Sequence, residues 1–166
     1  MSRQFDERLD AFFSEFGESR NMVLSTTDGV KVSSWMMSVV RIGRVFCFQT
    51  DRESRKYGQL CSNSNAALCI DNIQIEGTAE EAGRPMNNEA FRSLFVKCFK
   101  GSYDAYTSLK NERLFIVRPR FIERWLYING EPYIETFDLI SEQYRCEKYE
   151  SKWIRLAAVT AASLAL

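Results

Sequence analysis

The part of this chain best suited to chemistry is the junction between a predicted strand and a predicted helix, at residues 45–57. The strand ends at the hydroxyl of Thr50, and after a short turn Ser54, Arg55 and Lys56 open the helix. The first N–H groups of a helix lack partners and its dipole is positive there, so anions bind at this end. Arg55 can donate two hydrogen bonds to a phosphate, Lys56 adds a second positive charge, and both hydroxyls can donate. The spacing indicates a site for one phosphate monoester, although a solvated basic pair would leave the same pattern.

The sequence contains no histidine, which narrows the possible chemistry. No imidazole is available as a catalytic base, a zinc ligand or a haem ligand. Hydrolases that use a Ser-His-Asp or Cys-His arrangement are excluded for the same reason. Chemistry would have to use carboxylates, Lys, Arg, Tyr, Cys or a bound cofactor. Proton delivery would fall to water, a carboxylate, or a hydroxyl such as that of Tyr57 or Tyr127.

The charge and the cysteine content of the chain limit its binding partners and the cellular compartment in which it works. Lys+Arg and Asp+Glu both number 22, so the chain lacks the basic excess typical of nucleic-acid binders. Its five cysteines are odd in number and form no C-x-x-C pair, which favours a reducing compartment. The N-terminus is charged, and the longest apolar segment, 156–166, is too short to span a bilayer. We therefore expect a cytoplasmic protein that binds neither nucleic acid nor membrane.

The elements that must position the strand–helix junction are mostly strands. Phe5, Leu9, Phe12, Phe13 and Phe16 recur at helical spacing and predict an N-terminal helix. Tight turns, with Asp28-Gly29 the strongest hairpin signal, separate strands predicted at 21–27, 30–41, 44–50, 66–71, 73–82, 113–117 and 121–128. Further helices are predicted at about 54–61, 89–99 and 103–109. This order favours a mainly β, antiparallel barrel with peripheral helices as one domain over 1–140, followed by an extension over 141–166 that we expect to be helical.

Residues 48–57, Phe-Gln-Thr-Asp-x-x-Ser-Arg-Lys-Tyr, resemble the flavin-phosphate segment of the FMN-binding split-barrel family, which includes pyridoxamine 5'-phosphate oxidase. Residues 66–71, 72–77 and the run from Pro119 to Tyr133 also match, in the family's order. The resemblance covers about 23–133, most of the chain. It implies a six-stranded antiparallel split β-barrel that forms a homodimer, with flavin mononucleotide (FMN) at the subunit interface.

Transferred to this sequence, the resemblance assigns the FMN phosphate to Thr50, Ser54, Arg55 and Lys56, and places Gln49 near the ribityl chain. The other implied cofactor contacts are Trp35, Met36 and Met37 beside the isoalloxazine ring, Asn72 and Gln74 across the dimer interface, and Trp125 as a stacking residue.

Two departures from the family pattern shape the expected function. Family members often carry an arginine near position 35, where this chain has Ser33-Ser34-Trp35, so FMN binding is expected to be weaker unless Arg41 or Arg44 compensates. The oxidase's C-terminal substrate segment is not evident, so pyridoxamine phosphate oxidation is not the favoured activity. We expect an FMN-dependent oxidoreductase acting on a small molecule or NAD(P)H. The alternatives are a non-catalytic flavin carrier or sensor, or a barrel that binds another ligand such as a deazaflavin or haem.

Overall fold

The computed structural model describes residues 3–150 of the chain. Its strands are β1 (Ser19–Thr27), β2 (Val32–Ile42), β3 (Val45–Asp51), β4 (Asn65–Ile70), β5 (Ile73–Glu81), β6 (Glu112–Ile128), β7 (Glu131–Asp138) and β8 (Gln143–Lys148). The helical segments are α1 (Arg3–Phe16), α2 (Arg55–Ser62), η1 (Pro85–Asn87), α3 (Glu89–Cys98), α4 (Lys100–Ser102) and η2 (Tyr103–Thr107), the last of which is π-helical.

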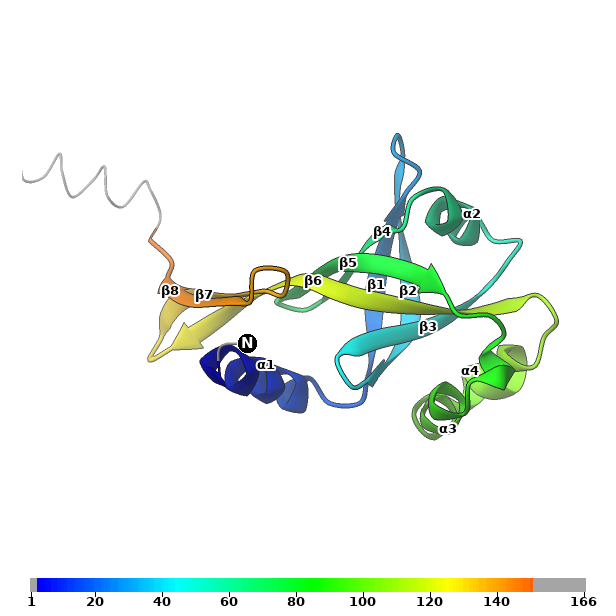
Figure 1. The fold of residues 1–166 in the computed structure, drawn as a ribbon, viewed down its shortest axis with the longest axis horizontal. Coiled ribbons are helices and arrows are strands. Elements are labelled where there is room, and N and C mark those ends of the chain that lie inside the picture. The colour runs from blue at the N-terminus through cyan, green and yellow to red at the C-terminus, as the bar shows by residue number, and fades with distance from the viewer. Residues whose placement is uncertain (1–2, 151–166) are drawn as a thin grey trace, which may run out of the picture.

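The strands form one antiparallel sheet in the order β3-β2-β1-β4-β5-β6-β7-β8. An additional pairing of β3 with β6, from Phe46–Val117 to Asp51–Glu112, closes the first six strands into a barrel (Figure 1). Closure leaves the six barrel strands without a free edge over this stretch. The predicted mainly β class and the six-stranded antiparallel barrel are therefore confirmed.

Strand β6 runs without a break for 17 residues, whereas the sequence predicted two strands separated near Pro119. That prediction is wrong because a β-bulge absorbs the proline. The β5–β6 register shifts between Glu76 and Gly77, which pair with Phe121 and Pro119 respectively. Gly77 is needed at this point, since a Cβ there would lie 2.2 Å from the backbone oxygen of Arg118.

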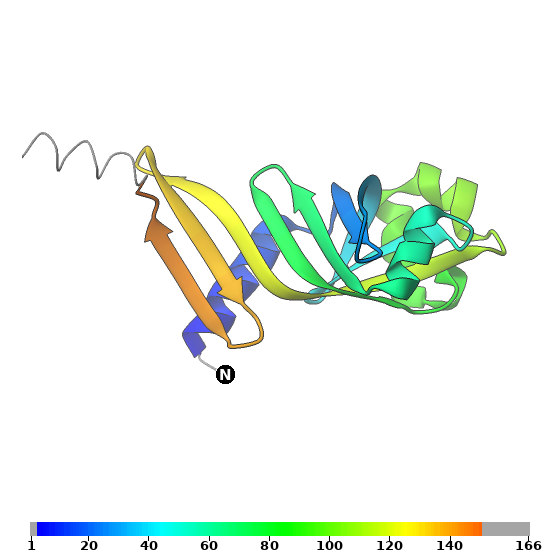
Figure 2. The same ribbon diagram turned by 90° about the horizontal axis from the view of Figure 1, so that it is seen from above.

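Strands β7 and β8 extend the sheet beyond the barrel, along the second half of β6. Figures 1 and 2 show them at the end of the molecule opposite α2, α3 and α4. The helical prediction for 141–166 is wrong for Gln143–Lys148, which form β8 and pair with β7 across the predicted boundary at residue 140. The segment Trp153–Leu166 lies outside the described residues.

Two hydrophobic clusters hold the fold together. The predicted helix α1 buries Phe5, Leu9, Phe12, Phe13 and Phe16 in the main cluster, as its spacing indicated. The second cluster packs the phenylalanines of α3, Phe91 and Phe95, against Val40 of β2, Cys47 of β3 and Leu114 of β6. Helix α3 is thereby fixed on the outside of the barrel beside the strand–helix junction. None of the helices within 3–150 is long and apolar enough to cross a membrane.

Candidate functional site

The strand–helix junction borders a cavity of about 400 Å³. Five of the residues assigned from the sequence line it: Met36 and Met37 from β2, Gln49 and Thr50 from the end of β3, and Lys56 from the first turn of α2. Met37 is buried in the main core and Met36 is 70% exposed, so the pair presents one fixed and one open apolar side chain. The structure thus brings together residues from three separate elements around one hollow.

The opposite wall was not found by sequence reasoning. It comes from the helical segment α3–η2 and the start of β6, and includes Phe95, Ser102, Tyr106, Leu109 and Glu112. The helix predicted at 89–99 is present, but its sequence did not indicate which strands it would cover. Glu112 reaches the cavity because it pairs with Asp51 at the end of β3, a contact between residues far apart in the sequence.

Ser54 starts helix α2 as predicted. Its backbone is extended, and its Oγ accepts a hydrogen bond from the backbone N–H of Tyr57 at 3.3 Å, the usual geometry of an N-cap. The Thr50 and Ser54 hydroxyl oxygens lie 3.1 Å apart. The two hydroxyls are therefore adjacent at the corner where the strand gives way to the helix.

The side chains of Arg55 and Lys56 converge on the ring of Trp35. The Arg55 guanidinium carbon lies 4.9 Å, and the Lys56 nitrogen 5.1 Å, from the ring centroid. The indole nitrogen donates to the Thr26 hydroxyl at 3.2 Å, which holds the ring in place. Within residues 3–150, neither cation forms an ion pair with a carboxylate. Two positive charges without ion pairs beside one aromatic ring mark a place where an anion would be stabilised.

Gln49 provides an unsatisfied polar group in the same cavity. Its side chain is 7% exposed, and its Oε1 has no hydrogen-bond partner among the described residues. A buried acceptor without a donor costs about 1–3 kcal/mol. A ligand hydroxyl or amide that entered the cavity would remove that cost.

Glu112 and Lys56 give the cavity an unusual electrostatic character. Burial, with a further contribution from Asp51, raises the pKa of Glu112 to about 7, although Lys56 and Arg113 act in the opposite direction. Burial also lowers the pKa of Lys56, against the opposing effect of Glu112 and Asp51. The Glu112 carboxyl group can therefore exchange a proton near neutral pH without any histidine.

Three assigned residues lie elsewhere in the subunit. The amide of Asn72 donates to the backbone oxygen of Trp125, whose N–H donates in turn to the backbone oxygen of Asn72 at 3.1 Å. The Trp125 ring packs on Tyr149, with 4.7 Å between centroids. Gln74 donates to Glu76 at 2.8 Å. Within one chain, these three residues do not join the cavity at the strand–helix junction.

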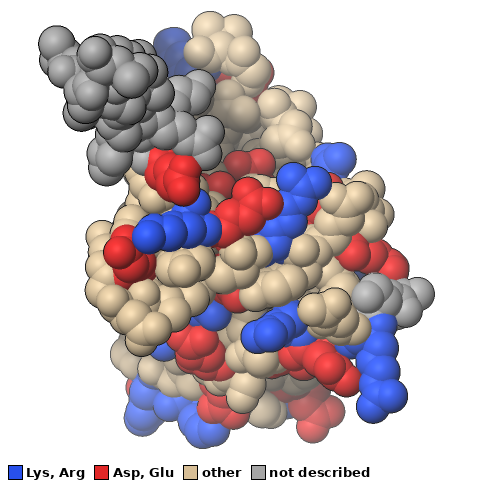
Figure 3. Space-filling view, turned by 90° about the vertical axis from the view of Figure 1, so that its left-hand side faces the viewer, with Lys and Arg blue, Asp and Glu red and all other residues tan. Residues whose placement is uncertain are grey.

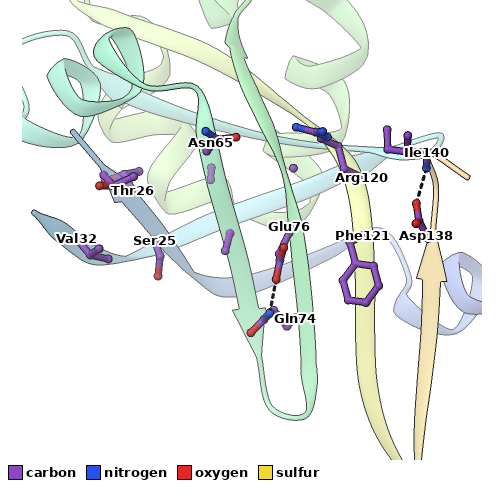
Figure 4. A pocket seen from close by; sticks show the side chains of 14 residues that line it. Ser25, Thr26, Val32, Asn65, Gln74, Glu76, Arg120, Phe121, Asp138 and Ile140 are labelled. Atoms are coloured by element: carbon purple, nitrogen blue, oxygen red, sulfur yellow. Dashed lines mark hydrogen bonds between the residues drawn. The ribbon is translucent and has the colours of Figure 1, made fainter. Parts of the chain in front are cut away.

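Gln74 instead lines a second, larger hollow of about 740 Å³ on the outer face of the barrel (Figure 4). Ser25 and Val32 lie on one side of it and Phe121 and Ile140 on the other, with the Gln74–Glu76 pair between them. This hollow also contains one cation, Arg120, but beside it lie two carboxylates, Glu76, which accepts from Gln74, and Asp138, which accepts from the backbone N–H of Ile140. Two hollows of different chemistry thus lie on the barrel.

The thiols supply no redox centre at the site. All five cysteines are free, and burial raises the pKa of Cys47 to about 12, which keeps it protonated and unreactive. Within residues 3–150, no three acidic or cysteine side chains are grouped so as to hold a metal ion.

No protein-family model and no curated protein matches this chain, but solved structures do. PhzG from Burkholderia lata, solved with tetrahydrophenazine-1-carboxylic acid, superposes with a TM-score of 0.55 at 15% identity, over 91% of this chain and 98% of its own. A putative pyridoxamine 5'-phosphate oxidase from Listeria innocua gives 0.51 at 16% identity, over 72% and 96%. HutZ, a heme storage protein from Vibrio cholerae, gives 0.56 at 16% identity, over 67% and 89%.

The chain therefore has the split-barrel fold of the pyridoxamine 5'-phosphate oxidase-like proteins, as the resemblance at residues 48–57 implied. The fold is shared by proteins with different ligands, so the ligand of this chain must be argued from its own residues.

Proposed function

We propose that this protein binds FMN in the cavity at the β3–α2 junction and acts as an FMN-dependent oxidoreductase. The observation that carries the proposal is that Lys56 and the partnerless Oε1 of Gln49 line one hollow, with the second cation, Arg55, beside Lys56 at the ring of Trp35. A flavin phosphate ester offers anionic oxygens for the first feature and ribityl hydroxyl groups for the second. The hollow, at about 400 Å³, falls within the range of about 300–1,000 Å³ typical of small-molecule sites.

Each residue at the junction has a role in holding such a ligand. Arg55 and Lys56 would neutralise the phosphate, and the hydroxyls of Thr50 and Ser54 would donate hydrogen bonds to it. Gln49 would accept from a ribityl hydroxyl. FMN, when bound, supplies hydride or electron transfer, while the protein supplies position and surroundings.

The exposed apolar side chains beside the cavity support a homodimer with the cofactor at its interface. Val32 is 75% and Met36 70% exposed, and both lie on β2 next to the two hollows. A second copy covering β2 would bury them and exclude water from the flavin ring. We propose that Asn72, Gln74 and Trp125 act in that assembly, because they do not line the cavity of their own subunit.

The surface charge indicates which binding partners the protein has, and its free cysteines indicate the cellular compartment. Acidic and basic side chains are interspersed on the face at the β7–β8 end, with no patch of one sign (Figure 3). This distribution supports a small-molecule substrate or NAD(P)H rather than a nucleic acid. The five free cysteines support a reducing environment, and we place the protein in the cytoplasm.

Haem is a weaker candidate for this cavity, although HutZ shares the fold. The described lining offers Tyr106 as a possible axial ligand and contains no cysteine, and the chain has no histidine. The lining also places Lys56 and Glu112 where an apolar macrocycle would have to pack.

The test is a titration of the purified protein with FMN and with riboflavin, followed by flavin fluorescence. Wild-type protein should bind FMN more tightly than riboflavin, because only FMN carries the phosphate. The R55A/K56A double variant should lose that preference, whereas R145A/K148A, which removes two cations on β8, should keep it. A double variant that binds FMN like wild type would overturn the proposal.

Reduction of bound FMN by NAD(P)H under anaerobic conditions separates the enzyme from a carrier or sensor. An oxidoreductase predicts loss of the oxidised flavin absorbance on mixing. Flavin that stays oxidised with both nicotinamide cofactors would favour the non-catalytic alternative.

A further inference from the structure

The most unusual group in the cavity is the carboxyl of Glu112. Its side chain is 6% exposed, and the residues described give its carboxylate neither a hydrogen bond nor an ion pair. It faces the same hollow as Gln49 and Lys56. A buried carboxylate without a partner is costly to the folded protein, so its charge state depends on its surroundings.

Those surroundings contain one charge of each sign, the like charge of Asp51 and the opposite charge of Lys56. Asp51 pairs with Glu112 across the β3–β6 ladder, and Lys56 of α2 lines the opposite part of the hollow. The neighbouring Arg113 is committed elsewhere, because its Nε lies 3.3 Å from a carboxylate oxygen of Glu81. From the helical wall only Tyr106 contributes a titratable side chain to the lining.

These charges oppose an incoming anion unless one carboxyl group is neutral. With Glu112 ionised, a phosphate that enters beside Lys56 meets the negative charges of both Glu112 and Asp51. With Glu112 protonated, it meets Lys56, one fewer negative charge, and an O–H group able to donate a hydrogen bond.

We propose that Glu112 is a specificity-determining residue of this cavity, whose carboxyl group must carry a proton before an anionic ligand such as the FMN phosphate ester binds beside Lys56. This role rests on the proposed function. It adds the condition that an anionic ligand binds only while the Glu112 carboxyl group is neutral. Binding the anion then fixes the proton on Glu112, because the added negative charge opposes ionisation.

The requirement for a protonated Glu112 determines the direction in which FMN affinity changes with pH. In the free protein the pKa of Glu112 is about 7, so the carboxyl group is protonated below that pH and ionised above it. FMN affinity should therefore change little between about pH 6 and 7 and fall above pH 7, by up to about tenfold per pH unit if only the protonated form binds. The phosphate itself loses its second proton near pH 6 and stays a dianion over the range above, so it does not produce this fall.

The experiment is a set of FMN and riboflavin titrations at pH 6.5, 7.5 and 8.5 on wild-type protein, E112Q, and E53Q as a control with an exposed glutamate near the same junction. Wild type and E53Q should lose roughly tenfold or more in FMN affinity between pH 6.5 and 8.5. E112Q, which mimics the protonated carboxyl group, should bind FMN about equally at all three pH values and more tightly than wild type at pH 8.5. That gain in affinity cannot arise from misfolding.

Three outcomes would overturn this role. E112Q that keeps the pH dependence of wild type would show that another group titrates. Riboflavin that loses affinity with pH as FMN does would show that Glu112 does not discriminate the phosphate. Absence of flavin binding by wild type and E112Q at every pH would defeat the proposed function itself, a result distinct from the other two. E112L provides a second neutral variant if E112Q melts far below wild type.

Discussion

The two ends of the long strand β6 treat buried charge in opposite ways. At the end beside α1 and β7, Arg124 is 11% exposed and donates to Glu135 and, at 2.8 Å, to Glu15. Glu135 also accepts a hydrogen bond from the Tyr144 hydroxyl at 3.0 Å. At the other end, beside α2, Lys56 and the buried Glu112 form no ion pair within the described chain, and the buried Oε1 of Gln49 has no hydrogen-bond partner there.

One end of β6 therefore contributes to the stability of the fold, and the other end contributes to the proposed ligand site. A buried ion pair with every group satisfied fixes how α1 and β7 pack on the sheet. Partnerless polar groups around a hollow bring no such benefit to the free protein, and a ligand is what would satisfy them. Variants at the two ends should therefore affect different measurements.

The largest expected effect is at the α1–β7 end. R124A leaves the Glu135 carboxylate buried without its cation, which should cost about 3–5 kcal/mol in the free energy of unfolding. Urea denaturation measures the loss, and FMN affinity of the folded fraction should remain at the wild-type value. R118A is the control, since its pair with Glu80 is exposed and should cost less than about 1 kcal/mol.

The next effect is a gain of stability at the cavity end. The pKa of Glu112 is raised in the folded state, so the folded protein holds a proton that the unfolded chain has lost, and stability falls as pH rises from about 4.5 to 7. E112Q removes this cost, which should reach the order of 2 kcal/mol at pH 8.5 and be smaller at pH 5. Denaturation of E112Q and wild type at both pH values measures it. Equal stability at pH 8.5 would mean that Glu112 is already satisfied.

The smallest effect concerns Trp35, on which the two cations rest. Loss of the ring in W35L should weaken FMN binding by about 3–30-fold, since a cation–π contact contributes about 0.5–2 kcal/mol. W35F keeps an aromatic face and should retain most of the affinity, which a purely steric role would not predict. Riboflavin affinity should change little in both variants. Equal FMN affinity of W35L and wild type would remove Trp35 from the site.

Features that depend on neighbouring residues in the sequence were predicted, whereas features that depend on tertiary contacts were not. The start of α2 at Ser54 follows from a strand, a hydroxyl and a basic pair within ten residues, and all of these contacts are short-range. The amphipathic helix α1 was equally readable from its phenylalanine spacing. Glu112 could not be placed, because its burial depends on the β3–β6 register and on the docking of α3.

Two errors have similar causes. Pro119 normally argues against a continuous strand, but a bulge opposite Gly77 allows β6 to pass through it, and bulges have no reliable local signal. Strand β7, which follows the turn at Asn129 and Gly130, two residues with positive φ, was also not predicted. The position of the Trp35 ring against Arg55 and Lys56 was not predicted, because it depends on how α2 packs over β2.

The most direct test is a crystal structure of the protein grown with FMN. The phosphate should lie within hydrogen-bond distance of the Thr50 and Ser54 hydroxyls and contact Arg55 and Lys56, with the ribityl chain beside Gln49. FMN bound only in the second hollow, near Gln74 and Phe121, or a β3–α2 cavity that stays free of FMN at saturating concentration, would contradict the proposal.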